Sequence, residues 1–211
     1  MSLELVDLRI APRDTSRPLF RPLSVSVTGG EVVTIMGPSG IGKSTLLDAI
    51  GGHIGPGFAV SGRVRLDGRD LVGLPAERRR IGVLFQDAML FPHLSVGQNL
   101  AFGLPPGLRG RTARRAAVEA ALHQAGLAGF NDRDPATLSG GERTRVALMR
   151  SLLADPRALL LDEPFSKLDA DLRDDIRGFV FDHVRRRKIP VLMVTHDAED
   201  AAAAGGPVVR L

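Results

Sequence analysis

The residues from Gly37 to Thr45 have the types and the spacing of a phosphate-binding loop. They read Gly-Pro-Ser-Gly-Ile-Gly-Lys-Ser-Thr, which fits the pattern G-x-x-x-x-G-K-[ST]. The glycines let the backbone N–H groups point at a phosphate, with the positive end of the following helix behind them. Lys43 can reach the terminal phosphates, and the Ser44 hydroxyl can hold a magnesium ion. The predicted phosphate-binding residues are Gly37, Pro38, Ser39, Gly40, Ile41, Gly42, Lys43, Ser44 and Thr45.

Two adjacent carboxylates, Asp162 and Glu163, follow the apolar run Ala158-Leu-Leu-Leu161. In phosphate-loop proteins a strand that ends in Asp brings a second group to the magnesium ion, and Asp162 is predicted in that role. Glu163 is predicted to polarise the water that attacks the γ-phosphate, a general-base task worth ~10²–10⁴-fold in rate. Without a phosphate loop the pair would be read as two solvent-facing acids. With one, the catalytic interpretation is favoured.

A second surface for an anion is predicted within Leu138-Ser-Gly-Gly-Glu142. Ser139 and Glu142 have the S-x-x-E spacing of a capping box, which starts a helix. Gly140 and Gly141 leave the first turn without side chains, so bare N–H groups lie at the positive end of the helix dipole. Because the chain already has one phosphate loop, we expect this second surface to meet the nucleotide of a partner.

The hydrophobic pattern around these residues predicts an α/β core that a helical insertion interrupts. Short strands are expected at 3–9, 23–27, 32–36, 62–66 and 81–85, followed by a helical stretch from about 96 to 154. The α/β pattern then returns as a strand at 158–161, a helix at 169–187, a strand at 190–194 and a final helix and strand. We therefore expect a single domain over 1–211, with a core of about 1–86 and 156–211 and a helical subdomain of about 87–155.

The composition fits a globular protein and argues against several classes. With 211 residues and 44% apolar content the chain can bury a sizeable core, and no stretch reaches the ~18 uninterrupted apolar residues of a membrane helix. There is no cysteine, and the first residues lack the layout of a signal peptide, so we expect a cytosolic protein. The net charge is +4, and the basic runs at 78–80, 109–115 and 185–188 have no interleaved aromatic residues. We interpret these runs as solvated helix faces, or as a surface near anionic lipid, and expect no nucleic-acid partner.

Taken in order along the chain, these motifs resemble those of the ABC ATPases. The phosphate loop is followed by Gln86, the Leu-Ser-Gly-Gly-Glu signature, Asp162-Glu163, Ser166-Lys-Leu-Asp169 and Thr195-His-Asp197. The resemblance covers essentially the entire chain. It implies the fold of that family, a P-loop NTPase core with an antiparallel β subdomain and a helical subdomain insertion. It also implies an ATPase whose cofactors are ATP and Mg²⁺.

The resemblance further implies roles that the residues alone do not reveal. In this family a head-to-tail dimer holds two ATP molecules, each between the phosphate loop of one subunit and the signature helix of the other. Gln86 would sense the magnesium and the attacking water, and His196 would contact the γ-phosphate as a catalytic residue beside Glu163. The implied magnesium ligands are Ser44, Gln86 and Asp162. The residues implied to act in trans are Ser139, Gly140, Gly141, Glu142 and Asp169, the last of which couples the two sites.

The segments 80–86, 90–96 and 99–104 look like those of bacterial importers, and the chain is especially similar to the small thiamine-importer-like ATP subunits. This resemblance implies a homodimer, or paired ATPase subunits, on two membrane permease subunits at the cytoplasmic face of the inner membrane. It also implies an extracytoplasmic solute-binding protein. The ATPase of an exporter is the alternative. An ABC ATPase that acts on ribosomes or DNA is disfavoured, because such proteins carry two nucleotide domains or a long coiled-coil insertion.

The chain departs from the family pattern at two motif positions. Glu142 stands where the signature usually has Gln, and either residue can complete a capping box. Lys167 stands where the family usually has a small residue or Arg.

The segment expected to contact the base also differs from the family. The adenine-stacking aromatic should lie within 10–17, where this chain has none, and Phe20 is the nearest candidate in an unsuitable register. We therefore expect the phosphates to dominate affinity, with apolar contacts to the base from side chains such as Ile10 or Pro12.

Overall fold

The computed structural model describes residues 1–15, 17–168 and 170–211. The chain divides into two compact units. The first unit comprises Met1–Val83, Arg157–Glu163 and Phe181–Leu211, and the second comprises Leu84–Pro156 and Pro164–Val180. The second unit contains the expected helical subdomain together with Pro164–Val180, which the sequence analysis had assigned to the core. That both units form one domain over 1–211 remains a prediction.

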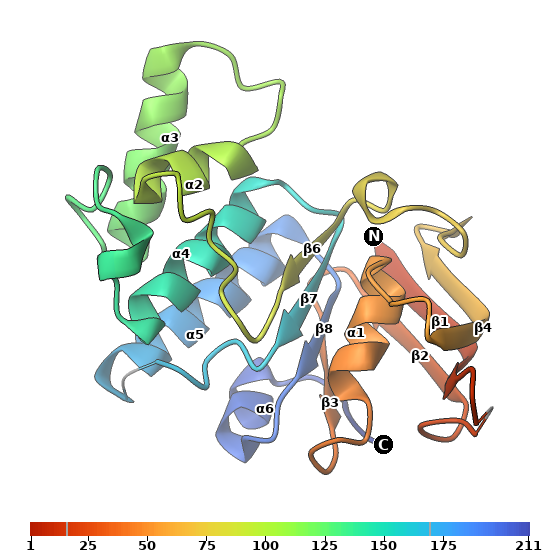
Figure 1. Cartoon of the computed structure of the whole chain (residues 1–211). Coiled ribbons are helices and arrows are strands. Elements are labelled where there is room, and N and C mark those ends of the chain that lie inside the picture. Colours follow the sequence, from red (N-terminus) through yellow and green to blue (C-terminus); the bar gives the residue numbers. More distant parts are fainter. Residues whose placement is uncertain (16, 169) are drawn as a thin grey trace. The chain divides into compact units, whose positions relative to one another are not determined.

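The first unit contains two sheets (Figure 1). The antiparallel sheet has the order β2-β1-β4-β5, with β1 Ser2–Pro12, β2 Leu23–Thr28, β4 Phe58–Leu66 and β5 Arg69–Asp70. The second sheet has the order β6-β7-β8-β3-β9, with β3 Val32–Met36, β6 Ile81–Leu84, β7 Ala158–Asp162, β8 Val191–Val194 and β9 Val208–Arg210. Strands β7, β8, β3 and β9 pair in parallel. The carboxyl ends of β7, β8 and β3 therefore meet at one edge, where ligands bind in open α/β sheets.

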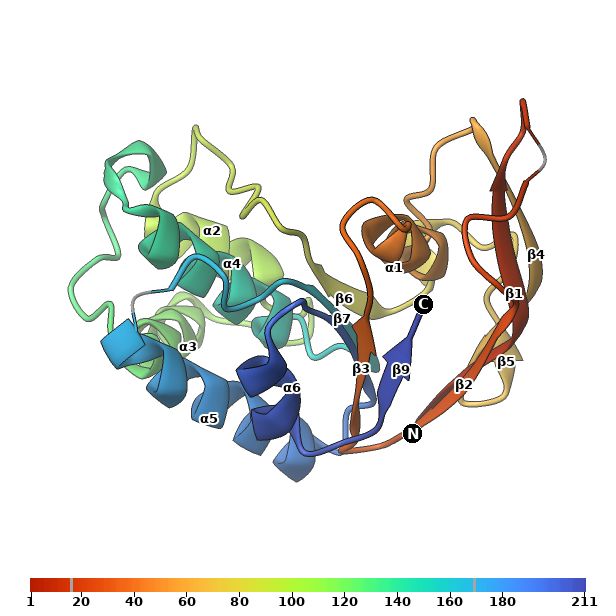
Figure 2. The same ribbon diagram turned by 90° about the horizontal axis from the view of Figure 1, so that it is seen from below.

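Helix α1 (Lys43–Gly51) lies between the two sheets (Figure 2). Its Leu46, Leu47 and Ile50 are buried in one cluster with apolar side chains of β1 and β3. Every residue of β7 and β8 is buried, which explains their continuous apolar sequences. Helix α6 (Ala198–Ala204) packs beside β3. The core thus fixes both the strand that enters the phosphate loop and the helix that leaves it.

The second unit is built around helices α2 (Val96–Gly103), α3 (Arg111–Gln124) and α4 (Gly140–Leu153). Helix α2 packs against both α3 and α4. Its approach to α4 is so close that a Cβ atom at Gly103 would clash with the carbonyl oxygen of Arg150. Single-turn 3₁₀ helices cover Ala76–Arg78 in the first unit and Pro135–Thr137 in the second. Helix α5 (Ala170–Arg187) contributes residues to both units.

Each strand and helix expected from the sequence is present, and most described ends shift by no more than three residues. Strand β4 is longer than expected, since it begins at Phe58 and not at residue 62. Strand β8 begins at Val191 because Pro190 has no N–H to add to a ladder. Among the described residues, no helix combines the length and the apolar character needed to cross a membrane.

Candidate functional site

The phosphate loop connects β3 to α1 and is shaped by glycines. Gly40 and Gly42 have φ angles of 80° and 103°, in the left-handed region that favours glycine. At Gly42, which caps α1, a Cβ atom would also lie 2.8 Å from Leu19 Cδ1. The first turn of α1 has no acidic side chain, so the positive end of its dipole is uncompensated. The loop and this helix start are suited to an anion.

Lys43 closes the loop on itself. Its Nζ donates hydrogen bonds to the carbonyl oxygens of Gly37 (2.8 Å) and Pro38 (3.0 Å), and the residue is only 8% exposed. The ammonium group is thereby kept at the mouth of the loop in a fixed position. A phosphate that enters the loop would take the place of these carbonyl oxygens as an acceptor for the ammonium group.

Asp162 ends β7 beside the start of α1 and accepts a hydrogen bond from the Ser44 hydroxyl. Burial raises the pKa of Asp162; the nearby Glu163 and Asp48 carboxylates raise it further, while Ser44 and Lys43 oppose the shift. Burial also raises the pKa of Asp48. Asp162 is buried, Asp48 and Glu163 are partly buried, and together these carboxylates carry negative charge that a cation would offset. Ser44 and Asp162 therefore fit Mg²⁺, which is commonly held by one or two protein oxygens together with the substrate phosphates.

Glu163 and His196 lie in direct contact. The Nδ1 atom of His196 is 2.8 Å from each carboxylate oxygen of Glu163. They meet because β7 and β8 pair in parallel with Asp162 opposite Val194, so each follows the carboxyl end of its strand closely. The Glu163 side chain is 16% exposed and that of His196 is 67% exposed. The structure thus joins two residues for which separate roles were predicted.

The backbone at Glu163 is unusual for a residue with a side chain. Its φ angle is 49°, and its N–H donates to the carbonyl oxygen of Val194 at 2.9 Å. A non-glycine residue in this conformation is strained, and such strain is often found at functional sites. The turn departs from the pleat of β7, so that Glu163 contacts His196 while its neighbour Asp162 bonds Ser44.

The turn that carries His196 is held by Asp200, which the sequence analysis did not single out. Thr195 Oγ1 donates to Asp200 Oδ2 (3.2 Å) and accepts from the N–H of Asp197 (3.0 Å). Asp197 in turn caps α6 by accepting from the N–H of Glu199. Asp is one of the residues preferred at an N-cap, so Asp197 was a local sequence signal for this cap.

In the second unit, the signature residues begin α4 as predicted. Ser139 Oγ accepts from the N–H of Glu142 (3.2 Å), and the Glu142 carboxylate accepts from the N–H of Ser139 (2.6 Å). That backbone hydrogen bond holds the pKa of Glu142 below its ordinary value. A Cβ atom at Gly140 would meet nothing within 4 Å, whereas one at Gly141 would lie 3.1 Å from the carbonyl oxygen of Lys167. The helix start therefore presents an open backbone at Gly140.

Gln86 also belongs to the second unit, where its carbonyl oxygen accepts a hydrogen bond from Lys167 Nζ at 3.1 Å. The segment that follows it is held by Asn99, a fully buried side chain that sequence reasoning missed. Asn99 accepts from the N–H of Phe91 and donates to the carbonyl oxygens of Phe91 and Leu94. From α4, Arg150 donates to the carbonyl oxygen of Met89 at 3.1 Å. Asp169, predicted to act in trans, lies outside the described residues.

The expected contact between Ile10 and the base is wrong. Ile10 has no exposed surface and Phe20 has 7%, because both side chains belong to the core cluster of the first unit. In β1 the alternation of Leu8 and Ile10 toward the core was the signal that this prediction overlooked. Pro12 is half-buried and keeps some accessible surface.

Known proteins match this chain over most of its length. The family model described as "ABC transporter" matches residues 20–166. The chain is 52% identical over 185 residues to the uncharacterized ABC transporter ATP-binding protein YnjD of Escherichia coli K12, an alignment that covers 88% of this chain and 85% of YnjD. It is 46% identical over 179 residues to the thiamine import ATP-binding protein ThiQ of Salmonella typhimurium, covering 85% of this chain and 75% of ThiQ.

A solved structure shares the fold. It is the dimeric ATP-binding cassette MJ0796 in a post-hydrolysis state bound to ADP and Pi. The TM-score is 0.84 with 29% sequence identity, over 100% of this chain and 94% of that one. The fold class and the use of ATP expected from the sequence are thus confirmed. The family match, together with the phosphate loop and the carboxylates at the end of β7, shows that the chain belongs to the ABC transporter family, as an ATP-binding subunit with ATPase activity.

Proposed function

We propose that this ATPase subunit powers the import of a small solute across the bacterial inner membrane. It would bind two permease subunits at the cytoplasmic face and work with an extracytoplasmic solute-binding protein. The Glu163–His196 pair is the observation that best supports hydrolysis. It lies at the same edge of the parallel sheet as the phosphate loop. Import is supported by the similarity to ThiQ, whose name describes a thiamine import ATP-binding protein.

We assign the steps of hydrolysis to the chain's own groups. The loop N–H groups and Lys43 would bind and orient the terminal phosphates, and Glu163 would accept a proton from the attacking water. The water oxygen then bonds to the γ-phosphorus as the bond to the bridging oxygen breaks. Because Glu163 occupies His196 Nδ1, the Nε2 atom is the one left to meet the γ-phosphate.

Ser44 and Asp162, with Gln86 from the second unit, would hold Mg²⁺. That ion supplies neutralisation of the charge on the β- and γ-phosphate oxygens. The buried Asp162 carboxylate supports this assignment, since its raised pKa reflects a charge that a cation would stabilise.

We further propose that a complete site needs two subunits, with Ser139, Gly140, Gly141, Glu142 and Asp169 acting on the partner's nucleotide. The open backbone at Gly140, at the positive end of α4, supports a role in binding an anion from outside the subunit. The solved cassette MJ0796, with its similar fold, is dimeric.

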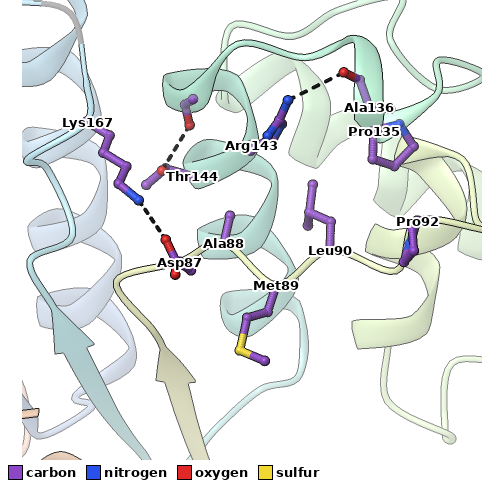
Figure 3. A pocket seen from close by; sticks show the side chains of 11 residues that line it. Asp87, Ala88, Met89, Leu90, Pro92, Pro135, Ala136, Arg143, Thr144 and Lys167 are labelled. Atoms are coloured by element: carbon purple, nitrogen blue, oxygen red, sulfur yellow. Dashed lines mark hydrogen bonds and ion pairs between the residues drawn. The ribbon is translucent and has the colours of Figure 1, made fainter.

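Docking on the permease is proposed through the segment 87–96. Its residues line a groove of about 470 Å³ together with residues of α4, within the second unit (Figure 3). Met89 and Phe102 are 65% and 68% exposed, and the Phe102 ring meets Phe91 edge-on at 4.7 Å between centroids. Large apolar side chains that are exposed, as Met89 and Phe102 are, favour contact with another protein.

Replacement of Glu163 tests the hydrolytic part of the proposal. Glu163→Gln removes the proton acceptor while keeping the side chain's shape, so turnover should fall by ~10²–10⁴-fold with ATP still bound. The variant should form an ATP-dependent dimer, measured by light scattering. A variant that stays monomeric at saturating ATP would refute the two-subunit site.

Replacement of exposed apolar residues tests docking and direction. Met89→Asp and Phe102→Asp should each release the protein from membranes without lowering the ATPase activity of the isolated protein. Val72→Asp is the matched control, because Val72 is 50% exposed but lies in the first unit. Loss of efflux instead of uptake on deletion of the gene would show that the protein serves an exporter.

A further inference from the structure

Lys167 lies in the loop that follows β7 and contacts Gln86 and Asp87, here called the Gln86 segment. Its Nζ donates hydrogen bonds to the carbonyl oxygen of Gln86 at 3.1 Å and to Asp87 Oδ1 at 2.9 Å. Figure 3 shows the Lys167 side chain extending toward Asp87 across one side of the groove. These residues all lie within the second unit. One ammonium group therefore bonds both the backbone and the side chain of the Gln86–Asp87 pair.

The backbone of Lys167 meets the signature helix at the same time. Its carbonyl oxygen lies 3.1 Å from the position that a Cβ atom would take at Gly141, which is tighter than ordinary van der Waals contact. Gly141 is buried in the first turn of α4. Residue 167 is thus a point at which the loop after Glu163, the Gln86 segment and the signature helix come together.

We propose that Lys167 is a positioning residue for ATP hydrolysis. It fixes the position of the Gln86 backbone relative to the start of α4, the signature helix. The inference rests on the proposed function, because it assigns Lys167 to the turnover step that Gln86 serves. When Gln86 moves, its hydrogen bond to Lys167 would carry the motion to the loop that begins at Glu163 and to Gly141. No contact between Lys167 and the nucleotide is needed for this role.

The exposure of the two charges limits the size of the effect. The Lys167 and Asp87 side chains are 43% and 88% exposed, so water and salt screen the ion pair. Pairs this exposed contribute little, and we expect their removal to lower kcat by about two- to fivefold. Part of the interaction should persist without Asp87, because the Gln86 carbonyl oxygen remains as an acceptor.

The test compares variants of the full chain in Mg²⁺-dependent ATP hydrolysis. Lys167→Met removes the ammonium at similar length, Lys167→Arg keeps a donor for both acceptors, and Asp87→Asn removes only the charge of the acceptor. Lys188→Met is the matched control, since it deletes one exposed lysine with the same change in net charge. We expect kcat to fall for Lys167→Met with KM for ATP nearly unchanged, and to be recovered by Lys167→Arg. Asp87→Asn should have a smaller effect, and the double variant should be no worse than Lys167→Met.

Two further readouts separate positioning from general stability. High salt should bring the parent's kcat toward that of Lys167→Met, and amide hydrogen exchange in residues 84–92 should be faster in Lys167→Met than in Lys167→Arg. An unchanged kcat in Lys167→Met, or an equal loss in Lys167→Arg, would overturn the inference while leaving the proposed function intact. A parent protein without ATPase activity would overturn both.

Discussion

Two capping boxes within the described residues differ in charge, which allows the effect of the signature glutamate to be isolated. Helix α2 begins with Ser95 and Gln98, and α4 begins with Ser139 and Glu142. In both, the Ser hydroxyl accepts from the third residue's N–H at 3.2 Å. The returning side chain accepts from the Ser N–H at 2.8 Å for Gln98 and at 2.6 Å for Glu142. The test replaces the Ser and the Gln or Glu of each box in turn.

The expected magnitudes follow from these hydrogen bonds. Ser139→Ala and Ser95→Ala each lose one cap, which costs ~1 kcal/mol and lowers the melting temperature by roughly 2–4 °C in a chain of this size. Glu142→Gln keeps the geometry and loses only the charge assistance, so it should cost less than Glu142→Ala. The reciprocal change, Gln98→Glu, should stabilise the protein slightly at pH 7.

The pH dependence of stability distinguishes the charged box from the neutral one. Because the pKa of Glu142 is lowered in the folded state, its contribution is fully present above the ordinary value of 4.5 and is lost as pH falls through the folded pKa. The difference in urea unfolding free energy between the parent and Glu142→Ala should therefore be constant from pH 7 to about 5.5 and shrink below about 4.5. For Gln98→Ala the difference should not change with pH. Equal pH profiles for the two boxes would refute the assignment of charge assistance to Glu142.

Three further outcomes are expected. Gly103→Ala should cost about 1–3 kcal/mol in chemical unfolding, since the added Cβ meets the carbonyl oxygen of Arg150, whereas Gly107→Ala, which faces open space, should be tolerated. Asp162→Asn should raise the unfolding free energy of the nucleotide-free protein increasingly as pH rises through the raised pKa of Asp162, and should abolish the Mg²⁺-dependent stabilisation by ATP in thermal shifts. In binding titrations ATP should be favoured over GTP by less than about a hundredfold, or roughly 2.7 kcal/mol, because Phe20 is buried; a larger preference would show that the base is recognised in another way.

The sequence was sufficient wherever the signal was local. The phosphate loop, the capping box at Ser139 and the two apolar strands β7 and β8 depend on residues that are neighbours along the chain. Their spacing therefore predicted both the elements and the residues at their ends. The roles of Gln86 at the magnesium ion and of Asp169 in trans came from family resemblance, and all roles in trans and all magnesium ligands stay predictions.

The remaining features depend on which distant segments become neighbours. Glu163 and His196 meet only because β7 and β8 are adjacent and in a particular register. The bonds from Lys167 to Gln86 and Asp87 join segments about eighty residues apart. The buried Asn99 reads as an ordinary polar residue of a helix until the loop beside it is known. No spacing along the chain encodes these contacts.

The two hydrogen bonds that keep Lys43 within its loop have a consequence for chemical labelling. The chain has only three lysines, Lys43, Lys167 and Lys188. An acylating reagent should react readily with the exposed Lys188 and more slowly with the ion-paired Lys167. Lys43, buried and bonded to two carbonyl oxygens, should be acylated only when its loop opens. The extent of acylation of the peptide that contains Lys43, measured by mass spectrometry, therefore reports how often the phosphate loop opens. The protein has few other amines that could react, so this signal is easy to detect.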